Sequence, residues 1–438
     1  MIYNTSGPLN PKIHKHIILE RKELNKSLIL IKESDNYVAV SGPRQFGKTT
    51  LLYQIQDDLP ANKFGVVYID LENAGDYKKN KFYNVISRTI MNSSLGLPEN
   101  IKTTYPLDKV IDQDKFVEFL IFISEHTPKF QKLIFLIDEI GGVPQEIAWK
   151  SFLPSLRWIF NAGRGNGKEG RLCSRLRFVF AGSTDLLHYV GHNSPINNVC
   201  ERVEIKEFDN EQVFRLTRKL EILGENQQKE IANSIYEWAG GHPYLTQKIL
   251  SVVEGNIAAF SNGKSIKSLN ELVESNIMSG QDKNVSHMVR MLESKPEYMT
   301  ILYPVYKGVN KKDVKYKEEL ITTGLLRIDD ETHFLKPRNK IYFHLINSLL
   351  DVNAVKLKSD SRIQSKLLLA VINIISSPKY IGEVVLETFG RSNPAISTKI
   401  FWGYAIIITL LLLVLGFIDA NTVSKIFITF WRFFFPVK

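Results

Sequence analysis

The stretch GPRQFGKTT at Gly42–Thr50 has the residue types and spacing of a phosphate-binding loop. It fits the pattern G-x-x-x-x-G-K-[ST] and lies between the apolar segment YVAVS and the helical segment TLLYQIQDDL, which is the context that a P-loop requires. Glycines let successive backbone N–H groups and the following helix N-terminus face phosphate oxygens, and Lys48 adds a positive charge for the β and γ phosphates. The Thr49 hydroxyl is a suitable ligand for Mg²⁺. The residues assigned to nucleotide binding are Gly42, Pro43, Arg44, Gln45, Phe46, Gly47, Lys48, Thr49 and Thr50.

Two adjacent carboxylates follow a second apolar run, KLIFLIDEIGG. In this Walker B arrangement, Asp138 would orient Mg²⁺ through its water shell. Glu139 would polarise the attacking water as a general base. A strand end with two solvated acids is the alternative, but the P-loop in the same chain favours the catalytic interpretation.

Two further polar segments have more than one interpretation. Ser183 and Thr184 end the run RFVFAGST, where P-loop ATPases place a polar residue near the γ-phosphate, but a helix cap explains them equally well. A basic, glycine-rich stretch precedes that run and is interpreted as a solvated loop. The alternatives are an arginine that reaches a neighbouring subunit's nucleotide and a loop that senses phosphate-rich ligands. Its basic residues are Arg164, Lys168, Arg171, Arg175 and Arg177.

The elements that must position these residues alternate along the chain. Apolar, β-branched runs separated by helical stretches predict a parallel α/β sheet covered on both faces. Residues 209–254 lack such runs and predict a helical subdomain, which Gly240, Gly241 and Pro243 divide by ending one helix and starting the next. Residues 296–350 read as two helices, a hairpin and a last helix, the order of a winged helix. The expected strands are 37–40, 64–72, 133–138, 176–182 and 202–208.

Composition narrows the class of protein. The chain has 438 residues, 44% of them apolar, and a formal charge of 56 − 46 = +10, which is ordinary for a globular protein. Its two cysteines, Cys173 and Cys200, form no disulfide framework or metal cluster and suit a reducing compartment. Lysines near residues 311–317 could contact nucleic acid, but neighbouring acids dilute the patch, so nucleic acid is not a favoured partner.

The C-terminal part carries a different signal. Ile400–Ile418 is an uncharged run of nineteen residues, about 28 Å long as a helix, which predicts a transmembrane segment in a lipid bilayer; a buried core helix is the alternative. Residues 419–438 place polar side chains on one stripe and predict an interfacial amphipathic tail. Residues 351–399 are read as a linker or helical region in which Leu367–Ile375 is another apolar run.

Six motifs in order resemble the bacterial AAA-like domain family of the STAND (signal-transduction) ATPases: ILERKEL, GPRQFGKTTLL, LIFLIDEI, FAGST, WAGGHPYLTQKI and ITTGLLRI. The resemblance runs from about Pro8 to Leu350. It implies an α/β P-loop domain of the AAA+ type with a helical lid and a winged helix, and ATP and ADP as ligands. It also implies that Arg21 lies near the base and that Gly241 and Pro243 close on the adenine. Glu20 departs from the family, because many relatives have glycine there.

Together these observations predict a slow ATPase that acts as an ATP-dependent conformational switch on the bacterial cytoplasmic membrane, with the ATPase region on the cytoplasmic side. The resemblance adds homo-oligomer formation on activation and a role in stress or anti-phage signalling. The alternatives are a replication-initiator-like DNA-binding AAA+ ATPase and an inert nucleotide-bound membrane scaffold. The expected divisions are 8–208 (nucleotide-binding), 209–284 (lid), 285–350 (winged helix), 351–399 (linker), 400–418 (transmembrane) and 419–438 (tail).

Overall fold

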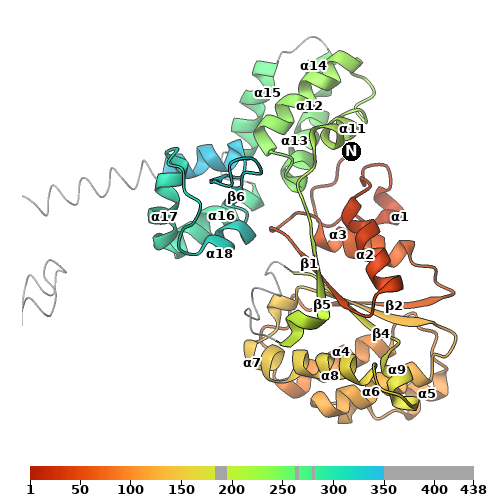
Figure 1. Cartoon of the computed structure of the whole chain (residues 1–438). Helices are drawn as coiled ribbons and strands as arrows, with labels where there is room; N and C mark the ends of the chain where they lie inside the picture. Colours follow the sequence, from red (N-terminus) through yellow and green to blue (C-terminus); the bar gives the residue numbers. More distant parts are fainter. Residues whose placement is uncertain (183–194, 262–265, 279–281, 350–438) are drawn as a thin grey trace, which may run out of the picture. The chain divides into compact units, whose positions relative to one another are not determined.

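The computed structural model describes residues 1–182, 195–261, 266–278 and 282–349, which belong to one compact unit, Met1–Leu350 (Figure 1). Its centre is a five-stranded sheet in the order β2-β3-β4-β1-β5, and every neighbouring pair is parallel. This confirms the prediction of a parallel α/β sheet. The strands are β1 (Tyr37–Ser41), β2 (Phe64–Asp70), β3 (Lys132–Asp138), β4 (Leu176–Phe180) and β5 (Cys200–Glu204).

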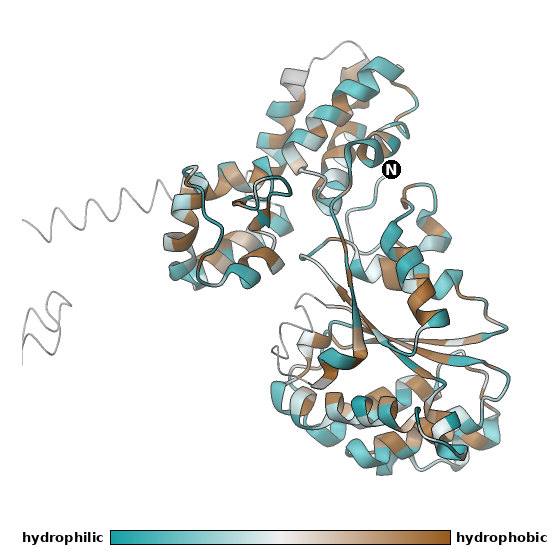
Figure 2. Ribbon diagram, in the orientation of Figure 1, coloured by the Kyte–Doolittle hydropathy of each residue, from teal (hydrophilic) through white to brown (hydrophobic). Residues whose placement is uncertain are grey.

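Helices cover both faces of the sheet because alternate strand residues point to opposite sides. In β1, Tyr37 and Ala39 pack against one helical layer, whereas Val38 and Val40 pack against the other. Figure 2 shows apolar strands between helices whose outer surfaces are largely hydrophilic. One layer contains α1 (Pro11–His14), α2 (Lys22–Glu33) and α3 (Lys48–Asp58); the other contains α4 (Lys79–Met91), α5 (Glu99–Thr104), α6 (Gln113–Glu125), α7 (Gln145–Ile147), α8 (Leu153–Ala162) and α9 (Lys168–Cys173).

The region after the sheet is helical, as the sequence predicts. A capping box between Asp209 and Gln212 starts the first helix. Gly240 ends the second with a left-handed φ of 57°, and Pro243 is the first residue of the third. The helices are α11 (Asn210–Thr217), α12 (Glu225–Ala239), α13 (Pro243–Gly255), α14 (Ile257–Ser261) and α15 (Ile266–Val273).

The last described segment contains the expected helices and hairpin. β6 (Leu326–Ile328) pairs antiparallel with β7 (Leu335–Pro337), and residues 340–349 are helical. Buried residues of this segment form one apolar core with those of α11–α13, so the two groups of helices pack together. The preceding helices are α16 (Lys283–Ser294), α17 (Pro296–Tyr306) and α18 (Lys317–Thr322).

The basic stretch before β4 differs from the expected solvated loop. Part of it is the helix α9, and two of its arginines bind inward. Arg175 donates to the carbonyl oxygens of Thr127 and Phe130 after α6, and the buried guanidinium of Arg177 pairs with Asp35. Basic side chains can therefore close helix ends inside a fold, where carbonyl oxygens lack other donors.

Both cysteines are free thiols that the fold covers. Cys173 is buried, and burial raises its pKa to about 11; burial also raises the pKa of Cys200 to about 12. The expectation that they form no disulfide agrees with this arrangement.

The predictions for 351–399, 400–418 and 419–438 fall outside the described residues. Among the helices of the described ranges, none combines the length and apolar character that a membrane crossing needs.

Candidate nucleotide site

The P-loop connects the C-terminal end of β1 to the N-terminus of α3. Gly47 precedes α3 with a left-handed φ of 89°, and Gln45 has a φ of 60°. These turns wrap the loop around the first backbone N–H groups of α3, which have no partner within the helix. The helix dipole adds positive potential at the same end, so the loop suits an anion such as a phosphate group.

Lys48 lies across the loop. Its Nζ donates to the carbonyl oxygens of Gly42 at 2.8 Å and Pro43 at 2.7 Å, and its side chain is buried. The ammonium group is therefore held beside the loop's N–H groups, where it adds a positive charge for bound phosphate.

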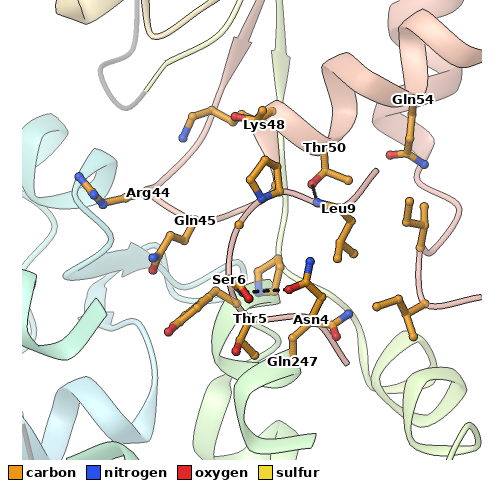
Figure 3. Close-up of a pocket in the computed structure, with 18 of the residues that line it drawn as sticks. Asn4, Thr5, Ser6, Leu9, Arg44, Gln45, Lys48, Thr50, Gln54 and Gln247 are labelled. Carbon is orange, nitrogen blue, oxygen red and sulfur yellow. Dashed lines mark hydrogen bonds between the residues drawn. The ribbon is translucent and has the colours of Figure 1, made fainter. Parts of the chain in front are cut away.

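A cavity of about 550 Å³ opens beside the P-loop (Figure 3). The wall opposite the loop comes from residues 4–9 and 17–19 of the N-terminal segment and from Pro243, Tyr244 and Gln247 of the lid. Nine residues that the sequence assigns to the site line the cavity. They are Arg21, Arg44, Gln45, Gly47, Lys48, Thr49, Thr50, Glu139 and Pro243.

The other described site residues support the wall without lining it. Phe46 is fully buried, with its ring 4.7 Å from that of His242. Gly241 has a φ of 72°, and a Cβ there would lie 2.0 Å from the carbonyl oxygen of Phe208, so only glycine fits. Gly42, Pro43 and Asp138 are likewise outside the cavity lining, and Ser183 and Thr184 lie outside the described residues.

Asp138 ends β3 in a nearly enclosed position. Its Oδ1 accepts the Glu139 N–H at 3.0 Å and its Oδ2 accepts the Tyr68 hydroxyl at 2.9 Å. Burial raises the pKa of Asp138, and hydrogen bonds from Thr49, Tyr68 and the Glu139 N–H oppose this effect. The Thr49 hydroxyl and the Asp138 carboxylate thus lie together and provide the hard oxygen ligands that Mg²⁺ prefers.

Tyr68 is a residue of this site that the sequence reasoning missed. It comes from β2, which pairs in register with β3, so its hydroxyl reaches the carboxylate two residues beyond its direct partner Leu136. The Tyr53 ring, one turn after Thr49 on α3, lies 5.1 Å from the Tyr68 ring. The only sequence signal is a tyrosine near the end of the strand next to the Walker B strand.

Glu139 directly follows β3 and turns the chain with a φ of 50°. Its neighbour across the turn is Gly182, where a Cβ would lie 3.4 Å from the Glu139 Cα. Glu139 and Thr49 both line the cavity, so the carboxylate-bearing residue has access to it.

Arg21 lines the cavity, but its guanidinium is occupied by backbone groups. It donates to the carbonyl oxygen of Lys206 at 3.0 Å and to that of Phe46 at 3.4 Å, and it lies 4.5 Å from the Phe208 ring centroid. Burial lowers its pKa to about 10. In this arrangement Arg21 fixes the P-loop against the segment that follows β5.

The N-terminal segment crosses the cavity, a feature that the motifs did not indicate. Tyr3 is buried and donates its hydroxyl to Leu216 on α11 at 2.7 Å. Further along, the Leu9 N–H donates to the Thr50 hydroxyl at 3.0 Å (Figure 3). Residues 4–8 are therefore held between the lid and α3.

The P-loop also contacts the first turn of α16. Gln45 Oε1 accepts from Asn284 Nδ2 at 2.5 Å, and Asn284 Oδ1 accepts the Tyr342 hydroxyl at 2.7 Å. Tyr342 lies 3.3 Å from His242 Nε2, and burial lowers the pKa of His242 to about 3, so this imidazole is neutral at neutral pH. The resulting chain of contacts joins the loop, the lid turn and the helical residues 340–349.

Arg338 forms a second connection between the P-loop and the C-terminal hairpin. Its guanidinium pairs with Glu207 at 2.5 Å and lies 5.3 Å from the Phe46 ring centroid. It also donates to the Leu326 carbonyl oxygen in β6 at 2.7 Å. Because the Arg338 guanidinium is buried, removing Glu207 would leave a buried positive charge without its carboxylate partner.

Parts of the chain are similar to known proteins in sequence and in structure. The chain is 25% identical over 245 residues to an uncharacterized WD repeat-containing protein of Synechocystis sp., and the match covers 54% of this chain but 20% of that protein. Among solved structures, the ORC2 protein of Aeropyrum pernix aligns with a TM-score of 0.44 and 11% identity, covering 81% of this chain and 98% of that one. A Pyrococcus horikoshii STAND protein with a tetratricopeptide repeat sensor aligns with a TM-score of 0.34 and 14% identity, and the alignment covers 95% of this chain and 58% of that one.

The match to a protein family is more extensive. The sequence model of the AAA-like domain matches residues 8–345, which include the P-loop, the Walker B carboxylates, the lid and the hairpin. This match spans more than half of the chain, and the chain belongs to the AAA-like domain family.

Proposed function

We propose that this protein binds ATP and ADP with Mg²⁺ and acts as a slow, nucleotide-dependent conformational switch. The observation that carries the proposal is the P-loop beside a cavity that the lid and the N-terminal segment also line. The first N–H groups of α3 and Lys48 would hold the phosphates. Mg²⁺ would supply a Lewis acid for phosphoryl transfer, held by Thr49 and, through water, by Asp138.

The contacts of the P-loop with the C-terminal segment support a switch rather than a simple ATPase. Gln45 and Phe46 contact Asn284 and Arg338, so a change in the loop on nucleotide binding would alter the contacts of the hairpin and the last helix. We propose that the segment 285–350 is a winged helix whose docking against the loop differs between nucleotide states. A ligand shifts such an equilibrium only by its difference in affinity for the two states.

We further propose that residues 400–418 anchor the chain in the bacterial cytoplasmic membrane, with the ATPase region in the cytoplasm. Their uncharged, apolar composition supports this assignment. The tail 419–438 would then act as an anchor or as the effector of activated homo-oligomers in stress or anti-phage signalling.

The central test is Lys48→Ala in the full chain. We expect the variant to lose measurable ATP and ADP binding by calorimetry, because it removes the cation beside the loop, while its thermal unfolding stays close to that of the wild type. Lys81→Ala on α4 is the matched control, because its ammonium lies on the Tyr77 ring away from the cavity. Unchanged nucleotide affinity in Lys48→Ala would remove the proposal.

A further inference from the structure

Gln247 carries a buried amide whose oxygen has no hydrogen-bond donor. The residue is 6% exposed, and its Oε1 accepts no hydrogen bond from any residue in the described ranges. Such an atom destabilises a folded protein, because it has lost its hydrogen bonds to water without gaining a donor in the protein. By contrast, the buried Gln228 on α12 uses its amide to donate to the Leu220 carbonyl oxygen at 3.1 Å. Gln247 is therefore unusual among the glutamines of the lid.

Gln247 lines the nucleotide cavity at the end away from Lys48. It lies one turn after Pro243 on α13, so both residues face the same side of that helix, and both line the cavity. Figure 3 shows Gln247 close to Asn4 and Thr5, with the P-loop residues Lys48 and Thr50 at the opposite side of the view. The unsatisfied amide thus belongs to the lid-side wall.

The two ends of the cavity differ in chemistry. The P-loop end presents N–H groups and an ammonium group, which suit phosphates. The lid contributes apolar side chain surface to the lining, such as that of Pro243, and Phe208 just before the lid also lines the cavity, besides the polar side chains of Asn4, Thr5 and Gln247. A nucleotide has the same polarity, because its phosphates are charged and the faces of its base are apolar. The base therefore fits the lid end, beside Gln247.

We propose that Gln247 selects adenine by accepting a hydrogen bond from the 6-amino group. This inference rests on the proposed nucleotide binding and names the base that the site takes. The terminal torsion of glutamine is soft, so the amide oxygen turns toward the cavity with little cost. A purine with a hydrogen at C6 has no donor at that position, and the oxygen stays without a donor.

Purine riboside 5′-diphosphate tests this inference because it differs from ADP only by a hydrogen in place of the 6-amino group. The experiment measures dissociation constants for both by calorimetry, with Mg²⁺ and the full chain. We expect the wild type to prefer ADP by about tenfold, the size of one buried hydrogen bond with its desolvation cost. Gln247→Leu should weaken ADP binding by about tenfold and leave the affinity for the purine riboside nucleotide within about twofold of the wild type, which abolishes the preference.

Stability provides a second readout. Gln247→Leu removes an unsatisfied buried oxygen, so the nucleotide-free variant should unfold at the same temperature as the wild type or higher. Gln228→Leu is the matched control. It should lower the unfolding temperature, because it removes one of the two hydrogen bonds to the Leu220 carbonyl oxygen and leaves only the Leu223 N–H as donor, and it should retain the preference for ADP. Gln247→Met repeats the test with an unbranched side chain if leucine packs poorly.

Several results would overturn the inference. One is equal affinity of the wild type for the two diphosphates, and another is a preference that survives in both Gln247 variants. A third is a ratio of the dissociation constants for ADP and 2′-deoxy-ADP that differs between Gln247→Leu and the wild type, which would show that the amide contacts the ribose. Loss of the preference in Gln228→Leu would assign the effect to lid packing. Wild type that binds neither diphosphate would contradict the proposed function as well, whereas the other outcomes leave nucleotide binding intact.

Discussion

A backbone turn at Glu139 gives this residue different surroundings from its neighbour Asp138. Asp138 stays enclosed at the end of β3 with donors on both oxygens, whereas Glu139 reaches the cavity wall. A carboxylate that binds a metal needs fixed geometry, and a general base needs access to water. The left-handed φ of Glu139 gives two consecutive acids these different surroundings.

Glu139→Gln should retain nucleotide binding and reduce phosphate release at least about 100-fold, because the amide keeps the shape of the side chain and removes the base. Affinity is measured by calorimetry and turnover by phosphate release. Phosphate release at the parental rate would show that Glu139 is not the base.

Tyr68→Phe should raise the Mg²⁺ concentration needed for half-maximal strengthening of ADP binding by about tenfold. The variant removes the donor that orients Asp138 Oδ2, and such supporting contacts commonly change metal affinity by this amount. Tyr83→Phe is the matched control, because that buried hydroxyl bonds Ser151 away from the site. An equal effect of the two variants on the Mg²⁺ dependence would exclude a specific role for Tyr68.

At the scale of elements, the C-terminal segment is positioned by a few polar contacts on the P-loop. Tyr342 reaches the loop through Asn284, whereas Tyr306, in the same core, donates to the Leu325 carbonyl oxygen away from the loop. These two buried tyrosines separate the effect of coupling from that of packing.

Tyr342→Phe should change the dissociation rate of ADP by about fivefold, because it releases the contact that holds Gln45 through Asn284. A change of this size corresponds to the free energy of one hydrogen bond. Tyr306→Phe should lower the unfolding temperature about as much as Tyr342→Phe does, but it should leave the dissociation rate of ADP unchanged. Stopped-flow displacement of a fluorescent ADP analogue measures both rates. Identical rates in the two variants would mean that the segment does not control nucleotide exchange.

Elements with a local signal could be predicted from the sequence. The strands follow from continuous apolar runs, the P-loop from glycine and lysine spacing, and the end of α12 from Gly240. Contacts between distant segments could not be predicted, because they depend on tertiary register. Tyr68 meets Asp138 only through the pairing of β2 with β3, and the N-terminal segment reaches the cavity only because Tyr3 is buried under α11.

The contacts of the charged residues Arg175 and Arg177 could not be predicted from the sequence either. Glycines and clustered positive charge are typical of exposed loops, yet these two guanidiniums bind the end of α6 and Asp35. Composition reports that a side chain is charged, but only the fold determines which carbonyl or carboxylate it meets.

At the scale of the whole molecule, the nucleotide motifs lie within the unit Met1–Leu350 and the candidate membrane run lies beyond it. A chain truncated after Lys399 should therefore be soluble and keep its ADP affinity within about twofold of the full chain, since no cavity residue is removed. Fractionation and calorimetry measure the two properties. A truncated chain that still sediments with membranes after a high-salt wash would place the anchor elsewhere, with Leu367–Ile375 the next candidate.

The covered thiols have a practical consequence for observing the switch. Maleimides react with thiolates, and the raised pKa of Cys173 and Cys200 keeps both groups protonated at neutral pH. Since these are the only cysteines of the chain, a new cysteine on the surface would be labelled selectively. Ile29 on α2 and Ile222, which lies in the lid between α11 and α12, are 54% and 64% exposed, so cysteines introduced at these two positions suit a donor and an acceptor dye. Energy transfer between them would follow the lid in single molecules as nucleotide is exchanged.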